Sequence, residues 1–255
     1  MSELFSIQLQ NRQQQGRDGV WLDLPTTTEQ VQVALRQIGI SSDNPQGLFI
    51  SGYFAEEEKR FAIPYNMVLA SNVDELNFLA SRLETLSTGE RAELNAALQA
   101  PQSELFSIGR ITDFPENVDY YVHLPDVHGP AQLGDYYLNR SGMVDMPEEW
   151  KGGIDTAQFG RYVAQQEQGA FTQYGYLVKS GDEWQKVHEG QPVPEEYRVL
   201  SFPAPEVLRD SANIPPPVQP ETEPQKVIPI ILNGKDSAER MKEITDRLET
   251  GIQQL

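Results

Sequence analysis

The chain has no cysteine among its 255 residues, so disulfide bonds and thiolate chemistry are excluded. It also has no apolar run approaching the roughly 18 residues of a membrane-spanning helix. The first ten residues, MSELFSIQLQ, lack the basic segment and apolar stretch of a secretory signal. Together these absences favour a cytoplasmic protein with no membrane partner.

Sequence signatures of catalysis are also missing, because there is no phosphate-binding glycine loop, nucleophile elbow or His-Glu-x-x-His motif. The nearest approach to a metal site is His123, Asp126 and His128 in HLPDVH, three possible zinc ligands within six residues. A proline-containing loop with two solvated histidines is the more ordinary interpretation. We therefore expect a protein that is not an enzyme and binds no cofactor or metal. A hydrolase or metal enzyme using residues 119–128 is kept as a third hypothesis.

The net charge of −18, from 38 acidic and 20 basic residues, is the strongest feature of the composition. Such a protein repels phosphate backbones, so direct binding to nucleic acid is disfavoured and basic protein surfaces become the expected partners. Solubility alone explains the acidity of many proteins. Between residues 104 and 155, however, the acids stand mostly singly among aromatic and aliphatic residues. That spacing predicts charge on an ordered surface rather than on a disordered acidic tail.

The first 65 residues have the pattern of a small α+β module. Four stretches read as β-strands: 4–10, 19–25, 47–54 and 60–65. Thr26 and Glu29 have the spacing of a capping box and predict a helix that begins after the second strand. We place the boundary of this N-terminal module at residue 65.

Residues 66–102 predict a helical middle module. Asn72 with Glu75, and Ser87 with Glu90, give two capping signals in succession. A leucine stripe follows the first signal and Pro101 ends the second helix, so we expect two short helices in a hairpin.

Residues 103–180 return to a mixed pattern and predict a C-terminal α+β module. The expected elements are a strand at 119–124, a helix at 130–142, a helix at 155–167 and a strand at 169–181. Gly160, inside the second helix, allows the close approach of a neighbouring element.

The last part of the chain differs in composition. Residues 181–235 predict a linker, because 213–225 read NIPPPVQPETEPQ and offer few core residues. Residues 236–255 predict an amphipathic helix. The predicted fold class is therefore α+β: an elongated chain of three small modules (mixed, helical, mixed) with a largely disordered Pro-rich tail ending in a helix.

Three pieces of the chain, in order and spacing, resemble the ArdA antirestriction proteins of plasmids and conjugative transposons over about residues 1–178. The first piece is GVWLDLP followed by EQVQVALRQIGI, and the second is NVDELNFLASRLETLSTGERAELNAALQA. The third is LGDYYLNRSGMVDMPEEW with FGRYVAQQEQGAFTQYGYL. Tyr162 departs from the pattern, which usually has an acid after the Gly-Arg pair. The end of the chain, MKEITDRLETGIQQL, also resembles the opening helix of an ArdC-like domain, which would make this chain part of a longer protein.

The ArdA resemblance implies a curved body of three modules that forms a homodimer and mimics bent duplex DNA. It implies a type I restriction–modification enzyme, through its methyltransferase core, as the partner. Duplex DNA carries roughly one charge per 1.7 Å of axis, so a mimic must spread its carboxylates along an ordered surface. The carboxylates expected to form that surface are Glu84, Glu90, Glu93, Glu104, Asp113, Glu116, Asp119, Asp126, Asp135, Asp145, Glu148, Glu149 and Asp155. The alternative is an acidic adaptor of a mobile element that binds another basic protein through the final helix.

Overall fold

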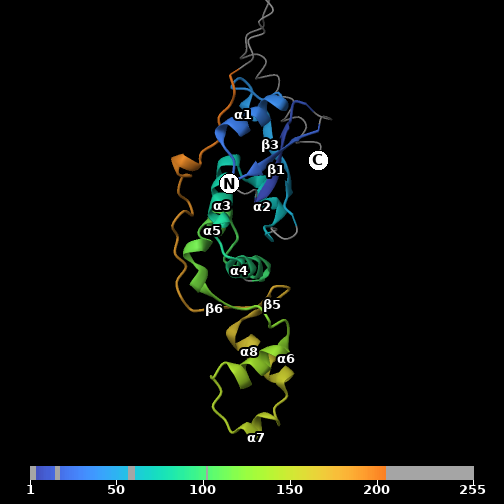
Figure 1. Cartoon of the computed structure of the whole chain (residues 1–255), viewed down its shortest axis with the longest axis vertical. Coiled ribbons are helices and arrows are strands. Elements are labelled where there is room, and N and C mark those ends of the chain that lie inside the picture. The colour runs from blue at the N-terminus through green and yellow to red at the C-terminus, as the bar shows by residue number, and fades with distance from the viewer. Residues whose placement is uncertain (1–3, 15–17, 57–60, 102, 205–255) are drawn as a thin grey trace, which may run out of the picture. The chain divides into compact units, whose positions relative to one another are not determined.

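The computed structural model (Figure 1) describes residues 4–14, 18–56, 61–101 and 103–204. The chain divides into two units, Met1–Glu206 and Val207–Leu255, and all described residues belong to the first unit. This unit combines helices with two antiparallel sheets, which confirms the predicted α+β class. The Pro-rich stretch at 213–225 and the final helix at 236–255 lie outside the described residues.

The first sheet contains three of the four strands expected near the N-terminus. They are β1 (Phe5–Asn11), β2 (Val20–Leu24) and β3 (Leu48–Phe54), in the order β2-β1-β3. Their alternation turns Ile7, Leu9 and Leu24 inward, where each is fully buried. Helix α1 (Thr28–Gln37) packs Val31 and Leu35 into the same core.

The prediction of a fourth strand at 60–65 is wrong for residues 61–65, the part that the structure describes. Phe61 and Ile63 are buried, as the alternation suggested, but residues 61–64 form no strand. The amide of Ala62 donates to the side chain of Asn95 at 2.7 Å instead. Pro64 then begins helix α2 (Tyr65–Ala70), because proline suits the start of a helix and cannot donate to a sheet.

The helical pair expected in the middle of the chain is confirmed. Helix α3 (Val73–Glu84) begins with the capping box of Asn72 and Glu75, and helix α4 (Thr88–Gln99) with that of Ser87 and Glu90. Leu76, Leu79 and Leu83 form the buried stripe of α3. The box before α1 lies one residue later than predicted, since Thr27 and Gln30 form it.

The second sheet has the order β4-β6-β5 and corrects one further expectation. Its strands are β4 (Tyr121–Leu124), β5 (Ala170–Thr172) and β6 (Gly175–Lys179). The single strand predicted at 169–181 is a hairpin, because the chain reverses at residues 173 and 174. Gly175 follows the turn with φ of 119°, a conformation that side-chain-bearing residues rarely adopt.

Two helices pack tightly beside this sheet. Helix α6 (Pro130–Asp135) continues as a π-helical turn (Tyr136–Arg140), and helix α8 (Thr156–Glu167) crosses it. Gly134 and Gly160 stand at the crossing, and a Cβ on Gly160 would lie 1.8 Å from the carbonyl oxygen of Pro130. Gly160 therefore allows the close neighbour that the sequence suggested. The remaining short elements are α5 (Ile108–Thr112), α7 (Glu148–Lys151), and 3₁₀ turns at Pro45–Gly47, Phe114–Glu116, Val118–Tyr120 and Glu195–Tyr197.

Two clusters of buried side chains hold the unit together. The larger cluster runs from the first sheet through α3 and α4 to Tyr121 and Leu177 of the second sheet. The smaller one contains Val127, Leu133 and Tyr176. The larger cluster joins residues from all three predicted modules, so the buried core does not mark boundaries at residues 65 and 102. Those boundaries stay a prediction.

Residues 181–204 do not have the character of the linker expected from residue 181. In Figure 1 this orange segment passes beside α3 and α5. Val199 is buried in the larger cluster, and the Ser42 amide donates to the Pro203 carbonyl oxygen at 2.9 Å. From its sequence the segment resembles a linker, because the residues that it packs against lie far away in the chain.

Candidate functional site

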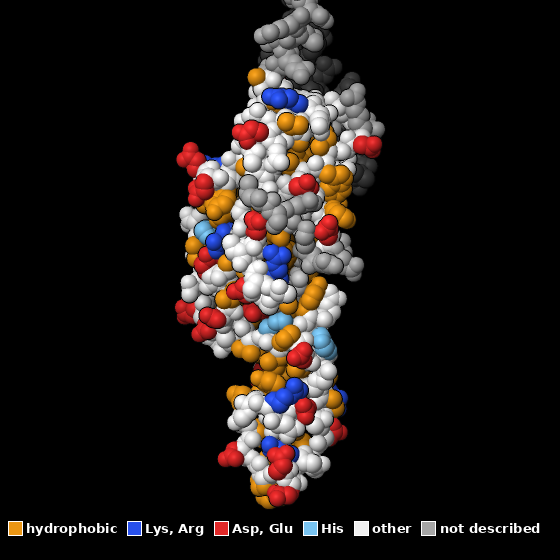
Figure 2. Space-filling model, in the orientation of Figure 1, with side chains coloured by type: hydrophobic (Ala, Val, Ile, Leu, Met, Phe, Trp, Pro, Cys, Tyr) orange, Lys and Arg blue, Asp and Glu red, His pale blue; other side chains and the backbone are white. Residues whose placement is uncertain are grey.

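The candidate surface is a set of carboxylates on the helical pair and on the short elements that follow it. Figure 2 shows acidic side chains singly or in small groups over the visible face, with apolar and basic side chains between them. Of the 13 carboxylates expected to act together, five are exposed and engage no basic residue among those that the structure describes. These are Asp119, Asp126, Asp145, Glu149 and Asp155.

Four other carboxylates of the expected set form ion pairs. Glu104 contacts both Arg110, at 2.8 Å, and Lys179, at 2.7 Å. The hydrogen bond from Lys179 lowers the pKa of Glu104, against the effect of its burial. The remaining pairs are Glu116 with Arg82, Asp135 with Arg140, and Glu148 with Lys151. The basic residues in these ion pairs partly offset the negative charge of the four carboxylates.

Asp113 lies in the interior, so the expectation that it belongs to the carboxylate surface is wrong. Its side chain is fully buried and its oxygens accept hydrogen bonds from the backbone amides of Val187, His188 and Glu189. The shortest of these, from His188, is 2.6 Å. The spacing of acids in the sequence could not distinguish this inward carboxylate from its exposed neighbours.

The local environment of each carboxyl on helix α4 sets its pKa and therefore its ionisation. Glu93 is partly buried, and this raises its pKa to about 8, helped by the negative charges of Glu90 and Asp119. Glu90 lies in the first turn of α4, where hydrogen bonds from the Ser87 side chain and backbone lower its pKa. At neutral pH Glu93 is therefore mainly protonated and Glu90 is ionised. Glu84 is partly buried near the end of α3.

The last members of the set lie on and around α7 and α8. Glu148 and Glu149 occupy the first turn of α7, where a negative charge is favourable near the helix N-terminus. Asp155 caps α8 by accepting a hydrogen bond from the Gln158 amide at 3.0 Å. The same carboxylate therefore positions the helix and presents charge to solvent.

Sequence reasoning missed several exposed acids of the first unit. Asp182, Glu183, Glu195 and Glu196 are exposed on the segment that we expected to be a linker. The high density of acids in this segment is visible in the sequence. Because we expected the segment to be a linker, we did not assign these acids to an ordered surface. Asp74 and Glu167 are not in the expected set of 13 carboxylates, and both accept internal hydrogen bonds.

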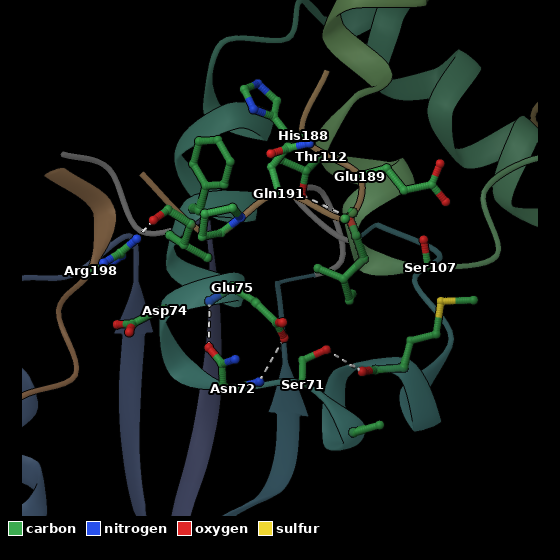
Figure 3. A pocket seen from close by; sticks show the side chains of 18 of the residues that line it. Ser71, Asn72, Asp74, Glu75, Ser107, Thr112, His188, Glu189, Gln191 and Arg198 are labelled. Atoms are coloured by element: carbon green, nitrogen blue, oxygen red, sulfur yellow. Dashed lines mark hydrogen bonds between the residues drawn. The ribbon is translucent and has the colours of Figure 1, made fainter. Parts of the chain in front are cut away.

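A cavity with a volume of about 1110 Å³ lies between α2, α3, α5 and residues 188–200 (Figure 3). Phe78 and Ile108 supply apolar lining. The polar groups around it already serve other roles: Asn72 and Glu75 cap α3, and Ser107 caps α5.

The metal-enzyme hypothesis gains no support from the described residues. None of their His, Asp and Glu side chains form a group of three that could hold a metal ion. The Nε2 atom of His123 instead lies 2.7 Å from the carbonyl oxygen of Tyr174. No helix in the described part of the chain is long and apolar enough to cross a membrane.

Comparison with known protein families gives a match to this chain. A family model described as antirestriction protein (ArdA) matches residues 15–178, which is more than half of the chain. A search of curated proteins found no match. The matched range begins after β1, includes the other five strands and helices α1 to α8, and ends one residue before the end of β6.

Proposed function

Because this chain belongs to the ArdA antirestriction protein family, we propose that it occupies the DNA-binding groove of type I restriction–modification enzymes as a mimic of duplex DNA. The Lys and Arg side chains of such a groove locate phosphates by charge and carry no sequence information. A carboxylate surface can therefore block enzymes that recognise different sequences. We also propose that the protein acts in the cytoplasm, as a homodimer.

The observation that carries this proposal is the ordered placement of unpaired acids on structure rather than on a tail. We call Asp119, Asp126, Asp145 and Glu149 the carboxylate set. All four are exposed, and three of them follow or belong to short helices or a strand between residues 118 and 151. Ordered charge is needed, since a flexible acidic segment would lose conformational entropy when it docked.

A competition experiment tests the proposal. The purified protein is titrated into a complex of a type I methyltransferase with fluorescent duplex DNA, and we expect displacement of the DNA. Neutralising the carboxylate set together (Asp→Asn and Glu→Gln) should weaken displacement at least tenfold, whereas each single change should have little effect. Restriction relief in cells should follow the same order.

The matched control removes equal charge elsewhere. Asp18, Asp43, Glu195 and Glu196 are also exposed, and their joint neutralisation should weaken displacement much less. An equal loss in both variants would show that net charge alone acts, and a single change that abolished displacement would exclude distributed recognition. The adaptor alternative predicts binding to a protein without a DNA groove, and loss of that binding when residues 236–255 are deleted.

A further inference from the structure

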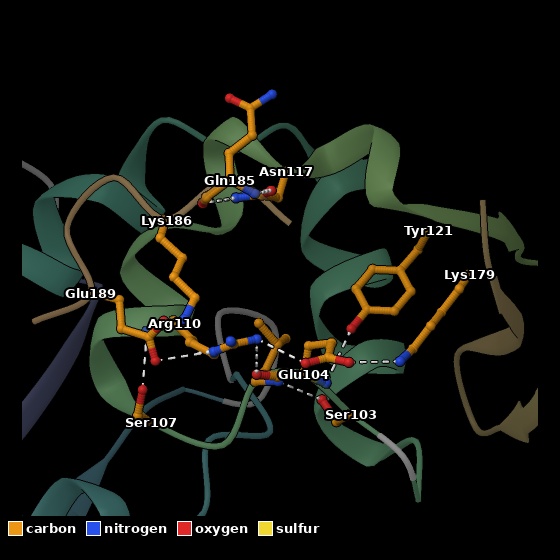
Figure 4. Close-up of polar contacts among 11 residues, drawn as sticks. Ser103, Glu104, Ser107, Arg110, Asn117, Tyr121, Lys179, Gln185, Lys186 and Glu189 are labelled. Atoms are coloured by element: carbon orange, nitrogen blue, oxygen red, sulfur yellow. Dashed lines mark hydrogen bonds and ion pairs between the residues drawn. The ribbon is translucent and has the colours of Figure 1, made fainter. Parts of the chain in front are cut away.

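Residues 181–204, which we call the strap, are bound mainly through their backbone by side chains of the preceding chain. Asp113 accepts hydrogen bonds from three consecutive strap amides, those of residues 187–189. Asn117 accepts from the Gln185 amide at 2.7 Å and donates to the Gln185 carbonyl oxygen at 3.0 Å. Figure 4 shows this reciprocal pair. These side chains give the strap the hydrogen bonds that a neighbouring strand gives in a sheet.

A second anchor holds the far end of the strap. One oxygen of Asp74 accepts from the amides of Val199 and Leu200, both at 2.7 Å. Asn77 donates to the carbonyl oxygen of Tyr197 at 3.0 Å while it accepts from the Thr26 amide at 2.7 Å. The anchor therefore links the strap to α3 and, through Thr26, to the entry of α1.

Side chains add contacts that depend on the strap's own sequence. Phe78 of α3 meets the rings of His188, at 4.9 Å between centroids, and Tyr197, at 4.7 Å. At the first of these two sites, Arg110 also pairs with Glu189 at 3.1 Å (Figure 4). The two kinds of contact resemble peptide recognition, in which main-chain hydrogen bonds give affinity and side-chain contacts give specificity.

The groove is incomplete without the strap. Asp113 is fully buried and ion-pairs with no described residue, and a carboxylate in that position is tolerable only when hydrogen-bond donors surround it. The hydrogen bonds that the Asp113 carboxylate accepts from the described residues come from backbone amides of the strap. The strap itself lies outside residues 15–178, the range of the family match.

We propose that the surface formed by Asp74, Asn77, Asp113 and Asn117 is a peptide-binding groove, and that residues 181–204 are its ligand, carried on the same chain. The recognised partner is an extended peptide with successive free amides and aromatic side chains at the positions of His188 and Tyr197. Docking holds the entry of α1, helix α3 and the turn after α5 in one arrangement. This binding lies within the chain and does not depend on which enzyme the protein inhibits.

Cutting the chain tests whether the strap is a separable ligand. A specific protease site is inserted after Gly181, which is exposed and is itself kept because its φ of 99° suits glycine. After cleavage of the full-length protein, we expect the C-terminal fragment to stay bound during gel filtration. Asp113→Asn combined with Asn117→Ala should release it. Asp119→Asn, an equal charge change at an exposed site, should retain it.

Hydrogen exchange on the uncut protein gives a second readout that does not depend on cutting. The amides of residues 185, 187, 188 and 189 should exchange about 10- to 100-fold faster in the double variant, as expected for the loss of hydrogen bonds to a charged group. Asp74→Asn should have this effect at residues 199 and 200. Release of the fragment from cut wild-type protein, unfolding on cutting, or unchanged exchange in the variants would overturn the proposal.

Discussion

Glu93 is the residue whose charge is most altered by the fold. Burial raises its pKa to about 8, and the charges of Glu90 and Asp119 add to the effect. One of its oxygens is buried without a hydrogen-bond partner in the described structure. A carboxyl whose pKa is higher in the folded than in the unfolded chain favours folding while it is protonated. That contribution is complete below the unfolded value and is lost as pH rises through about 8.

We therefore expect Glu93→Gln to stabilise the protein at alkaline pH. Below about pH 4.5 the variant and wild type should unfold at similar urea concentrations, because both carry a neutral side chain. The difference in the free energy of unfolding should grow between pH 5 and pH 8 and then level off. Urea titrations at four pH values measure it. A difference that is constant with pH would show that folding does not raise the pKa of Glu93.

Gly160 offers a prediction about packing. A methyl group there would lie 1.8 Å from the Pro130 carbonyl oxygen and 2.7 Å from the Gly134 nitrogen, both of which are backbone atoms. Backbone cannot yield as a flexible side chain can, so Gly160→Ala should cost about 3 kcal/mol or more. Gly152→Ala is the control, because a methyl group at Gly152 meets nothing within 4 Å. Thermal unfolding should separate the variants, and equal stability would mean that α6 and α8 are not in contact.

At the scale of elements, the capping box of α4 combines a structural and a proposed functional role. Glu90 accepts a hydrogen bond from the Ser87 amide, and its own amide donates to the Ser87 hydroxyl. Ser87→Ala should therefore cost about 1 kcal/mol in the free energy of unfolding. Glu90→Gln should change it by less than about 0.5 kcal/mol, since glutamine also serves in such boxes. Gln30 does so before α1.

Glu90→Gln consequently removes charge without removing the cap. Combined with neutralisation of the carboxylate set, it should reduce DNA displacement further while leaving urea unfolding unchanged. A large loss of stability in Glu90→Gln would show that the ionised carboxylate, and not its geometry, holds the helix start.

The elements that could be predicted from the sequence are those whose determinants are local. Asn72 with Glu75, and Ser87 with Glu90, are three residues apart, so both boxes could be recognised before any fold was known. The hairpin of β5 and β6 was missed because its turn, at residues 173 and 174, has no strong turn signal apart from Gly175. The strand expected at 60–65 failed because alternation predicts burial but cannot supply a neighbouring strand.

The strap and the inward position of Asp113 could not be predicted for a different reason. Asp74 lies 125 residues before Val199, and Asp113 lies 75 residues before His188. No local pattern encodes such pairings, and a segment with few core residues reads as a linker until its partners are known. The family resemblance covered the body and likewise gave no information about residues 181–204.

At the scale of the whole molecule, the net charge of −18 makes binding to a cationic groove dependent on salt. Association of opposite charges releases bound counterions, so the logarithm of the affinity should fall linearly with the logarithm of the salt concentration. For six to ten DNA phosphates, affinity falls about 10³- to 10⁵-fold between 50 and 200 mM salt. This protein should lose less, because ion pairs such as Glu104 with Lys179 already offset part of its charge.

The salt slope also distinguishes local from global charge. Neutralising the carboxylate set should make the slope shallower, since fewer groove cations are then matched. Neutralising Asp18, Asp43, Glu195 and Glu196 should leave it nearly unchanged, although both variants have the same net charge. Competition titrations at four salt concentrations give both slopes. Affinity that does not change with salt would exclude electrostatic mimicry, whereas two equal slopes would place recognition in the overall field rather than in the surface between residues 118 and 151.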